Sequence, residues 1–225
     1  MEIMITNDDG IDAPGIKALY KALDGNKVIV APNEPHSGCG HQVTTHKPLE
    51  TTIRSKYEIA VHGTPGDCSR IGITHYARDV EWVISGINAG GNLGVDLYIS
   101  GTAAAAREAT ILGKRAIAIS HWIRESKPID WDKACLLARK VFAELFDKPI
   151  PQNFFWNINL PHVFANENEP EIIYCDPSYD PLPVKYRVEG NIFHYTGEYS
   201  KRNRKSGSDV DVCFSGNIAV SLVRI

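Results

Sequence analysis

The segment that decides the fold is Glu2-Ile3-Met4-Ile5-Thr6-Asn7-Asp8-Asp9-Gly10, a short apolar run that ends in a polar turn. Over 14–23 it is followed by apolar side chains at helical spacing, namely Ile16, Leu19, Tyr20 and Leu23. A β-branched stretch then covers 27–31 and stops at Pro32. Strand, helix and strand in this order predict a βαβ unit with a parallel sheet, whose carboxyl edge carries the loop after each strand.

The rest of the first 160 residues repeats this alternation. Apolar runs bounded by turn residues predict strands at 43–52, 57–61, 81–85, 116–120 and 154–160. Helices are expected from about Cys68, capped by Thr64 or Asp67, and over 103–112 and 131–146. The chain is therefore expected to adopt an α/β fold with a mostly parallel sheet.

After about residue 160 the sequence becomes acidic, dotted with proline and β-like. We therefore predict a metal- and phosphate-binding core over 1–160 and a small β-rich C-terminal segment over 161–225. Within that segment, 186–195 reads as a hairpin and 216–223 as a closing strand. The basic run Lys201-Arg202-Asn203-Arg204-Lys205 is expected to be a solvated loop. Alternatively, it reaches over an active site and steers anionic substrates.

Composition excludes several classes of function. The chain has 225 residues, with 24 Lys and Arg against 27 Asp and Glu, so its net charge of −3 does not favour binding of long nucleic acids. The N-terminus lacks the pattern of a signal peptide, and no run of 18 apolar residues occurs, so we expect a cytoplasmic protein without a membrane partner. The five cysteines are odd in number and widely spaced, which predicts buried thiols.

Adjacent carboxylates at the end of the first strand are the first chemical signal. Asp8 and Asp9 repel each other, and a hard divalent cation is the usual way to offset such repulsion. Loops after two neighbouring strands contain Ser37 and Asn88, and together the four oxygen ligands suit Mg²⁺ or Mn²⁺. Two alternatives remain: Asn7 or Asp8 only caps the next helix, or a zinc cluster forms from His36, Cys39, His41 and His46.

Two further loops have the composition of an anion site. Gly86–Gly94 exposes many backbone N–H groups, but its glycine order is not that of a dinucleotide fingerprint. Ser100-Gly101-Thr102 opens the helix 103–112 with hydroxyls and free N–H groups, which suits a phosphate dianion, although an ordinary N-cap explains it as well. A hard cation and an anion-binding helix end on one sheet edge indicate phosphate-ester hydrolysis.

Several ordered motifs make the chain resemble the SurE family of stationary-phase survival nucleotidases. They are Ile5-Thr6-Asn7-Asp8-Asp9-Gly10 with Ala13-Pro14-Gly15-Ile16, Val30-Ala31-Pro32 with Ser37-Gly38, Gly63-Thr64-Pro65 with Asp67-Cys68, Ser85-Gly86-Ile87-Asn88-Ala89-Gly90 with Asn92-Leu93-Gly94, and Ser100-Gly101-Thr102. The likeness continues more weakly through 157–161 and 208–210. Departures from the family pattern are His36 in place of a frequent Arg and Gly91 in place of a common Pro.

The resemblance implies a Rossmann-like, three-layer core and a C-terminal segment exchanged between subunits of a homodimer or homotetramer. It implies a phosphatase that uses one Mg²⁺ or Mn²⁺ per subunit to hydrolyse nucleoside 5′- and 3′-monophosphates. By motif, the metal ligands are Asp8, Asp9, Ser37 and Asn88. The phosphate-contacting residues are Asn92, Ser100, Gly101 and Thr102.

Our main hypothesis is in-line attack of water on phosphorus, with Asp8 or Asp9 as the catalytic residue that orients or deprotonates that water. One alternative is a phosphatase in which Asp8 is a covalent nucleophile. Its usual D-x-D spacing is missing, because Asp8 and Asp9 are adjacent. The other alternative is a nucleotide sensor that binds metal and nucleotide without catalysis.

Overall fold

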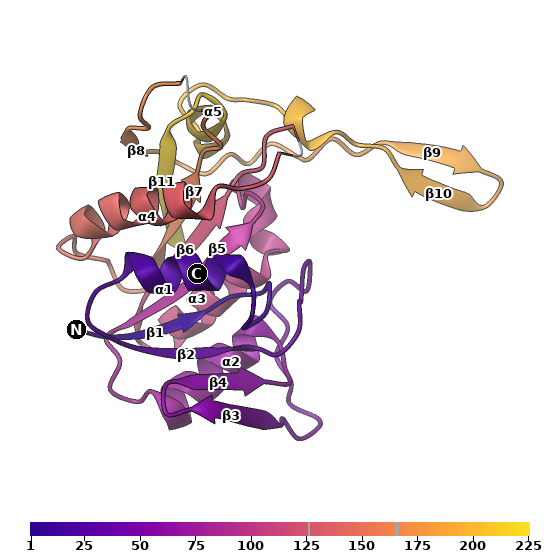
Figure 1. The fold of residues 1–225 in the computed structure, drawn as a ribbon. Helices are drawn as coiled ribbons and strands as arrows, with labels where there is room; N and C mark the ends of the chain where they lie inside the picture. The colour runs from indigo at the N-terminus through magenta and orange to yellow at the C-terminus, as the bar shows by residue number, and fades with distance from the viewer. Residues whose placement is uncertain (126, 165–166) are drawn as a thin grey trace.

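A single large sheet organises the chain in the computed structural model, which describes residues 1–125, 127–164 and 167–225 (Figure 1). In these residues the sheet has nine strands, in the spatial order β3 (Thr51–Ser55), β4 (Glu58–Val61), β2 (Asn26–Pro32), β1 (Glu2–Thr6), β5 (Trp82–Ala89), β6 (Arg115–His121), β7 (Phe154–Leu160), β11 (Ile218–Arg224) and β8 (Ile172–Tyr174). The strands from β4 to β7 are parallel to their neighbours, whereas β3 and β11 pair antiparallel with β4 and β7. The predicted α/β fold with a mostly parallel sheet is confirmed.

Helices cover both faces of this sheet and make three layers (Figure 1). Helices α1 (Pro14–Ala22) and α4 (Trp131–Leu145) pack together on one face, and α2 (Pro65–Ile71) and α3 (Gly101–Ile111) on the other. Strand β1 supplies both cores, because side chains alternate along a strand. Ile3 and Ile5 lie in the core with α1 and α4, whereas Met4 lies in the core with α2 and α3.

Local signals in the sequence start these helices where expected. Thr64 caps α2 in a reciprocal pair with Asp67, in which each side chain accepts a hydrogen bond from the other residue's backbone N–H. Gly15 lets α1 approach β5 closely, because a Cβ atom at that position would lie 1.9 Å from the carbonyl oxygen of Ile87. Larger residues at position 15 would therefore separate the helix from the sheet.

Three elements differ from the sequence predictions. Strand β5 extends to Ala89 rather than ending at Ser85, because Asn88 and Ala89 continue to pair with β6. Residues 43–50 form no strand, and Thr44 instead bonds through its backbone N and Oγ1 to the Asp67 carboxylate. A short helix, α5 (Asp209–Phe214), was not predicted and is capped by Ser208.

The C-terminal region contributes to the main sheet as well as to a separate hairpin. Strand β11 pairs with β7 from Ala219 to Arg224, and β8 pairs with β11. The sheet therefore crosses the division expected at residue 160, since β11 finds its hydrogen-bonding partner in β7. Strands β9 (Tyr186–Glu189) and β10 (Ile192–Tyr195) form the predicted hairpin, which projects away from the rest of the molecule (Figure 1).

The cysteines form no disulfide among the described residues, and the helices are short. All five cysteines are free, with Cys68 and Cys213 buried and the other three half-buried. Across the described ranges, no helix combines the length and the apolar character needed to span a bilayer.

Candidate functional site

The carboxyl ends of β1, β2 and β5 meet around Asp8 and Asp9. The backbone N–H of Ala89, next to Asn88, donates to Oδ2 of Asp9 at 3.0 Å. From the loop after β2, the backbone N–H of His36, next to Ser37, donates to the carbonyl oxygen of Asp8 at 2.7 Å. The structure thus brings together the three segments that carry all four predicted metal ligands, as expected for the carboxyl edge of parallel strands.

Asp8 is buried against the first turn of α3. Thr102 Oγ1 donates to Asp8 Oδ1 at 2.6 Å, and a Cβ atom at Gly101 would lie only 2.8 Å from the Cβ of Asp8. Burial raises the pKa of Asp8 to about 6, the hydrogen bond from Thr102 opposes that rise, and the charge of Asp9 adds to it. Gly101 therefore permits the close approach of the helix to a carboxylate that Thr102 orients.

Asp9 is more exposed to solvent than Asp8, and like Asp8 it has no positively charged partner among the described residues. Burial raises the pKa of Asp9, against the hydrogen bond from the Ala89 backbone. Within the described residues, neither aspartate forms an ion pair with a lysine, arginine or histidine. Two adjacent carboxylates in this state fit a divalent cation, because its charge would stabilise both ionised forms.

Asn88 and Ser37 lie next to the residues whose backbone N–H groups contact the two aspartates. The Nδ2 group of Asn88 donates to the carbonyl oxygen of Gly90 at 2.7 Å, which leaves Oδ1 as the free acceptor of the side chain. Ser37 is exposed on the loop beside Asp8. Carboxylate, amide and hydroxyl oxygens are ligands for hard cations such as Mg²⁺ and Mn²⁺, so the chemistry of the set fits the metal expected from the sequence.

The zinc alternative is wrong. No group of three or more His, Cys, Asp or Glu side chains is arranged to share a metal ion in the described ranges, which include every candidate ligand. His41 Nε2 instead lies 2.7 Å from Oε2 of the buried Glu108.

The predicted phosphate-contacting residues separate into two groups. Ser100 is the N-cap of α3, where its Oγ accepts from the backbone N–H of Ala103 at 3.0 Å. The next two residues, Gly101 and Thr102, contact Asp8. Asn92 is instead a buried residue of the glycine loop, and its Nδ2 donates to Ser120 Oγ at 2.7 Å. The first group therefore lies beside the aspartates, whereas the side chain of Asn92 is bonded to Ser120 inside the protein.

Sequence reasoning missed a buried carboxylate that ties the Ser37 loop to α3. Glu108 accepts from Arg70 Nε at 2.6 Å and lies against His41, while its side chain is only 3% exposed. A signal was present, since Glu108 stands four residues after Ala104 in a helix whose alanines are fully buried. At that spacing Glu108 lies on the same buried face of α3 as the alanines, so its carboxylate needs a charged or hydrogen-bonding partner inside the protein.

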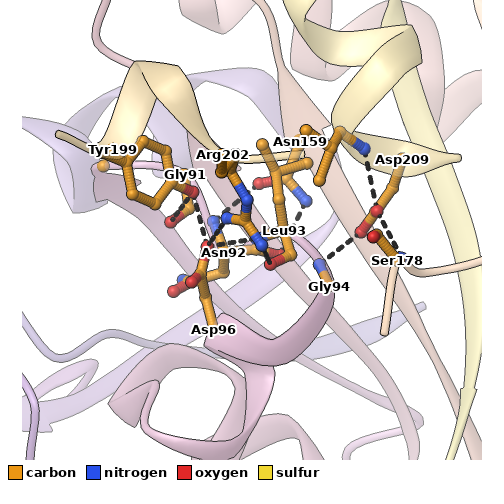
Figure 2. Close-up of polar contacts among 12 residues, drawn as sticks. Gly91, Asn92, Leu93, Gly94, Asp96, Asn159, Ser178, Tyr199, Arg202 and Asp209 are labelled. Carbon is orange, nitrogen blue, oxygen red and sulfur yellow. Dashed lines mark hydrogen bonds and ion pairs between the residues drawn. The ribbon is translucent and has the colours of Figure 1, made fainter. Parts of the chain in front are cut away.

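A C-terminal cluster was also missed (Figure 2). Arg202 donates through Nη1 to Asp96 Oδ2 at 2.7 Å, and its side chain is only 1% exposed. The expectation of a solvated loop over 201–205 is therefore wrong for Arg202, although the other four residues of the run are exposed. Nothing local marks Arg202, because its partner lies 106 positions earlier in the chain.

Comparisons with known proteins identify the family of this chain and agree with its fold. The sequence model of the family described as "Survival protein SurE" matches residues 3–178. A Synechocystis sp. protein named "Putative 5'-nucleotidase alr3139" is 56% identical over 225 residues, which cover 100% of both chains. The "5'-nucleotidase SurE" of Geobacter sulfurreducens is 36% identical, covering 98% of this chain and 87% of that protein. The crystal structure of the SurE protein from Aquifex aeolicus matches with a TM-score of 0.86 at 28% identity, covering 100% of this chain and 93% of that one. With its aspartate pair at the carboxyl edge of the sheet, this chain belongs to the SurE family.

Proposed function

We propose that this protein is a metal-dependent phosphatase that hydrolyses nucleoside 5′- and 3′-monophosphates. Asp8, Asp9, Ser37 and Asn88 hold one Mg²⁺ or Mn²⁺ in each subunit. The observation that carries the proposal is the pair of adjacent carboxylates, raised in pKa and without a cationic partner among the described residues, beside the N-terminus of α3. The nucleotidase names of relatives that align with nearly the whole chain support the substrate class.

The residues around the aspartates have separable roles. When bound, the cation polarises a phosphoryl oxygen and lowers the pKa of water. Asp8, buried and bonded through Oδ1 to Thr102, holds a fixed position. Asp9 is partly exposed, so we assign to it the orientation of the attacking water and acceptance of its proton.

The start of α3 faces the same carboxylate edge. Helix N-termini carry partial positive charge and unpaired backbone N–H groups, which stabilise the oxygens of a phosphoryl group as their charge develops. Ser100 fixes the first turn of this helix by capping it, and Gly101 keeps the turn close to Asp8. We propose that the substrate phosphate lies between this turn and the aspartates.

The projecting hairpin β9–β10 has an exposed apolar face that favours assembly into a homo-oligomer. Phe193 pairs with Val188 and Tyr195 with Tyr186, so one face of the ribbon carries four apolar or aromatic side chains. All four are more than half exposed in the single chain. Exposed apolar faces of this kind mark interaction sites, and we propose that this one packs against another subunit in a dimer or tetramer.

Phosphate release tests the proposed activity. Purified protein is mixed with 5′- and 3′-mononucleotides in the presence of Mn²⁺, Mg²⁺ or EDTA, and we expect turnover only with a divalent cation. Asp8→Asn and Asp9→Asn should each lower kcat by at least about 100-fold, because each removes a metal-binding charge. Unchanged circular dichroism would show that both variants are folded.

Asp12→Asn is the matched control. Asp12 lies in the same loop, but its carboxylate is exposed and forms an ion pair with Arg54. This variant should keep the activity of the unmodified protein. Near-normal turnover in both Asp8→Asn and Asp9→Asn would reject the assignment of the site.

A further inference from the structure

One continuous segment, residues 88–102, touches both aspartates. At its start, the backbone N–H of Ala89 donates to Asp9 Oδ2, and at its end Thr102 Oγ1 donates to Asp8 Oδ1. Between these contacts the segment leaves β5, passes through the glycines, and forms the short 3-10 helix η2 (Gly94–Tyr98) before α3 begins. Any shift of this segment would therefore move the partners of both carboxylates together.

The middle of the segment is held by side-chain contacts, namely hydrogen bonds between Asn92 and Asn159 of β7 and a buried ion pair (Figure 2). Asp96 Oδ2 accepts from the backbone N–H of Leu93 at 3.1 Å and from Arg202 Nη1 at 2.7 Å. Arg202 Nη2 donates in turn to the carbonyl oxygen of Leu93 at 3.1 Å. Arg202 thus bridges a carboxylate and a carbonyl of the same turn.

Tyr199 completes this contact. Its hydroxyl lies 2.5 Å from Asp96 Oδ2 and 3.5 Å from the carbonyl oxygen of Gly91. Burial, together with the Asp96 charge, raises the pKa of Tyr199, so the phenol stays protonated and donates its hydrogen bond. The Asp96 side chain is only 7% exposed, which excludes water as the main partner of its charge.

A second contact holds the next residue of the turn. The backbone N–H of Gly94 donates to Asp209 Oδ2 at 2.6 Å, while Ser178 N–H donates to Asp209 Oδ1 at 2.8 Å. Gly94 has φ +56°, and a Cβ atom there would lie 2.2 Å from the carbonyl oxygen of Ser178. The C-terminal chain therefore encloses the turn from two sides (Figure 2).

We propose that Arg202, through its ion pair with Asp96, is a positioning residue for the active centre. The pair fixes segment 88–102 so that Ala89 and Thr102 keep their contacts with Asp9 and Asp8. This inference rests on the proposed function, since it assigns to the C-terminal region a part in building the same site. Outer partners of metal ligands usually change metal affinity or activity by about 10- to 100-fold when they are removed.

The experiment compares Arg202→Met with Lys205→Met. Both variants remove one positive charge from the same run, but Lys205 is exposed whereas Arg202 is buried. For Arg202→Met we expect kcat to fall about tenfold and the dissociation constant of Mn²⁺ to rise about tenfold, with KM changing less than about twofold. Amide hydrogen exchange across 88–102 should become faster. Lys205→Met should match the unmodified protein in all four measurements.

Two further variants, Tyr199→Phe and Arg202→Lys, test the proposal even if Arg202→Met fails to fold. Tyr199→Phe removes one hydrogen bond to Asp96 but leaves the Asp96 charge paired with Arg202. This variant should therefore fold even if Arg202→Met does not. It should lower kcat and weaken Mn²⁺ binding, as expected for Arg202→Met. Arg202→Lys retains the charge and should recover part of the lost kcat. A folded Arg202→Met protein, or a Tyr199→Phe protein, with kcat, Mn²⁺ affinity and hydrogen exchange equal to those of Lys205→Met would overturn the proposal.

Failure of the two proposals can be told apart. An unmodified protein without phosphatase activity contradicts the proposed function, whatever its variants do. The positioning role is then still decided by Mn²⁺ titration and by hydrogen exchange of 88–102, which need no turnover. Normal activity with no difference among the variants contradicts the positioning role alone.

Discussion

At the scale of single residues, the site depends on how one buried carboxylate is held. Asp8 is 4% exposed and lies two residues after the end of β1, where its carbonyl oxygen accepts from the backbone N–H of His36. Its side chain is oriented by Thr102, which is fully buried and belongs to α3. The hydroxyl of Thr102, which the sequence suggested as a phosphate contact, thus donates a hydrogen bond to the carboxylate of Asp8.

Replacing Thr102 by Val should therefore impair catalysis more than folding. The change keeps the shape of the side chain and removes the hydrogen bond to Asp8 Oδ1. We expect kcat to fall about 10- to 100-fold with weaker Mn²⁺ binding, measured by phosphate release and metal titration. Thr110→Val is the control, because that hydroxyl donates to the Ala106 carbonyl of the same helix. Equal kcat values for the two variants would contradict the role of Thr102.

At the scale of elements, neighbouring strands deliver their polar groups to one edge because they are parallel. Strand β6 continues this edge beside β5, and it ends at His121, whose backbone carbonyl oxygen accepts from the N–H of Gly90 at 3.0 Å. His121 is 5% exposed, and burial lowers its pKa to about 4. Its Nδ1 atom donates to the carbonyl oxygen of Trp122 at 2.8 Å, and its ring contacts the ring of His162 edge-on.

This depressed pKa predicts a loss of stability in acid. Between pH 6.5 and 4 the unfolded chain binds a proton at His121 that the folded chain does not bind, so the free energy of unfolding falls as pH falls through this range. The contribution of His121 amounts to about 2 kcal/mol between pH 7.5 and pH 5, from a slope that approaches 1.36 kcal/mol per pH unit below pH 6.5. Urea unfolding at pH 7.5 and 5.0 measures it.

His121→Asn provides the comparison, because the asparagine amide can donate in place of Nδ1 and does not titrate. The difference in unfolding free energy between the two pH values should be about 2 kcal/mol smaller in the variant. Asp8 and Asp9, whose raised pKa values act in the opposite direction, are common to both proteins and cancel. An unchanged pH dependence would show that His121 is not held neutral in the fold.

At the scale of the whole molecule, the C-terminal chain first completes the sheet and then leaves it. Strand β11 pairs with β7, α5 packs near it, and the hairpin between β8 and α5 projects outward (Figure 1). The two faces of the hairpin differ. Tyr186, Val188, Phe193 and Tyr195 share one face, whereas Arg187, Glu189, Ile192 and His194 share the other.

Disrupting the apolar face should weaken assembly. Val188→Ser combined with Phe193→Ser changes one cross-strand pair whose side chains are 53% and 65% exposed. Burying each apolar side chain stabilises an interface by about 1.5–3 kcal/mol, so the dissociation constant should rise more than about tenfold. Light scattering after size-exclusion chromatography should then report a smaller particle.

Arg187→Ser combined with His194→Ser is the control for the opposite face of the same ribbon. It changes a cross-strand pair at the neighbouring position of the hairpin. This double variant should keep the mass of the unmodified protein. A monomeric unmodified protein, or equal masses for both double variants, would contradict assembly through the apolar face.

Local chemistry explains which features could be predicted from the sequence. The unit β1–α1–β2, the Thr64 cap and the hairpin all depend on residues within a few positions of one another, so periodicity and turn composition were sufficient. The position of Asp8 and Asp9 at a strand end followed from the same patterns. Strand β5 was predicted too short because glycines usually end a strand, and pairing with β6 overrides that tendency here.

Contacts between distant parts of the chain could not be predicted in this way. Thr102 reaches Asp8 across 94 positions and Arg202 reaches Asp96 across 106, so no pattern within a window of sequence contains both partners. By itself, the sequence determined the α/β alternation and the chemistry available at the sheet edge. Only the tertiary structure decided which hydroxyl orients Asp8 and that Arg202 is buried, because burial and pairing of a charge depend on the groups that folding brings beside it.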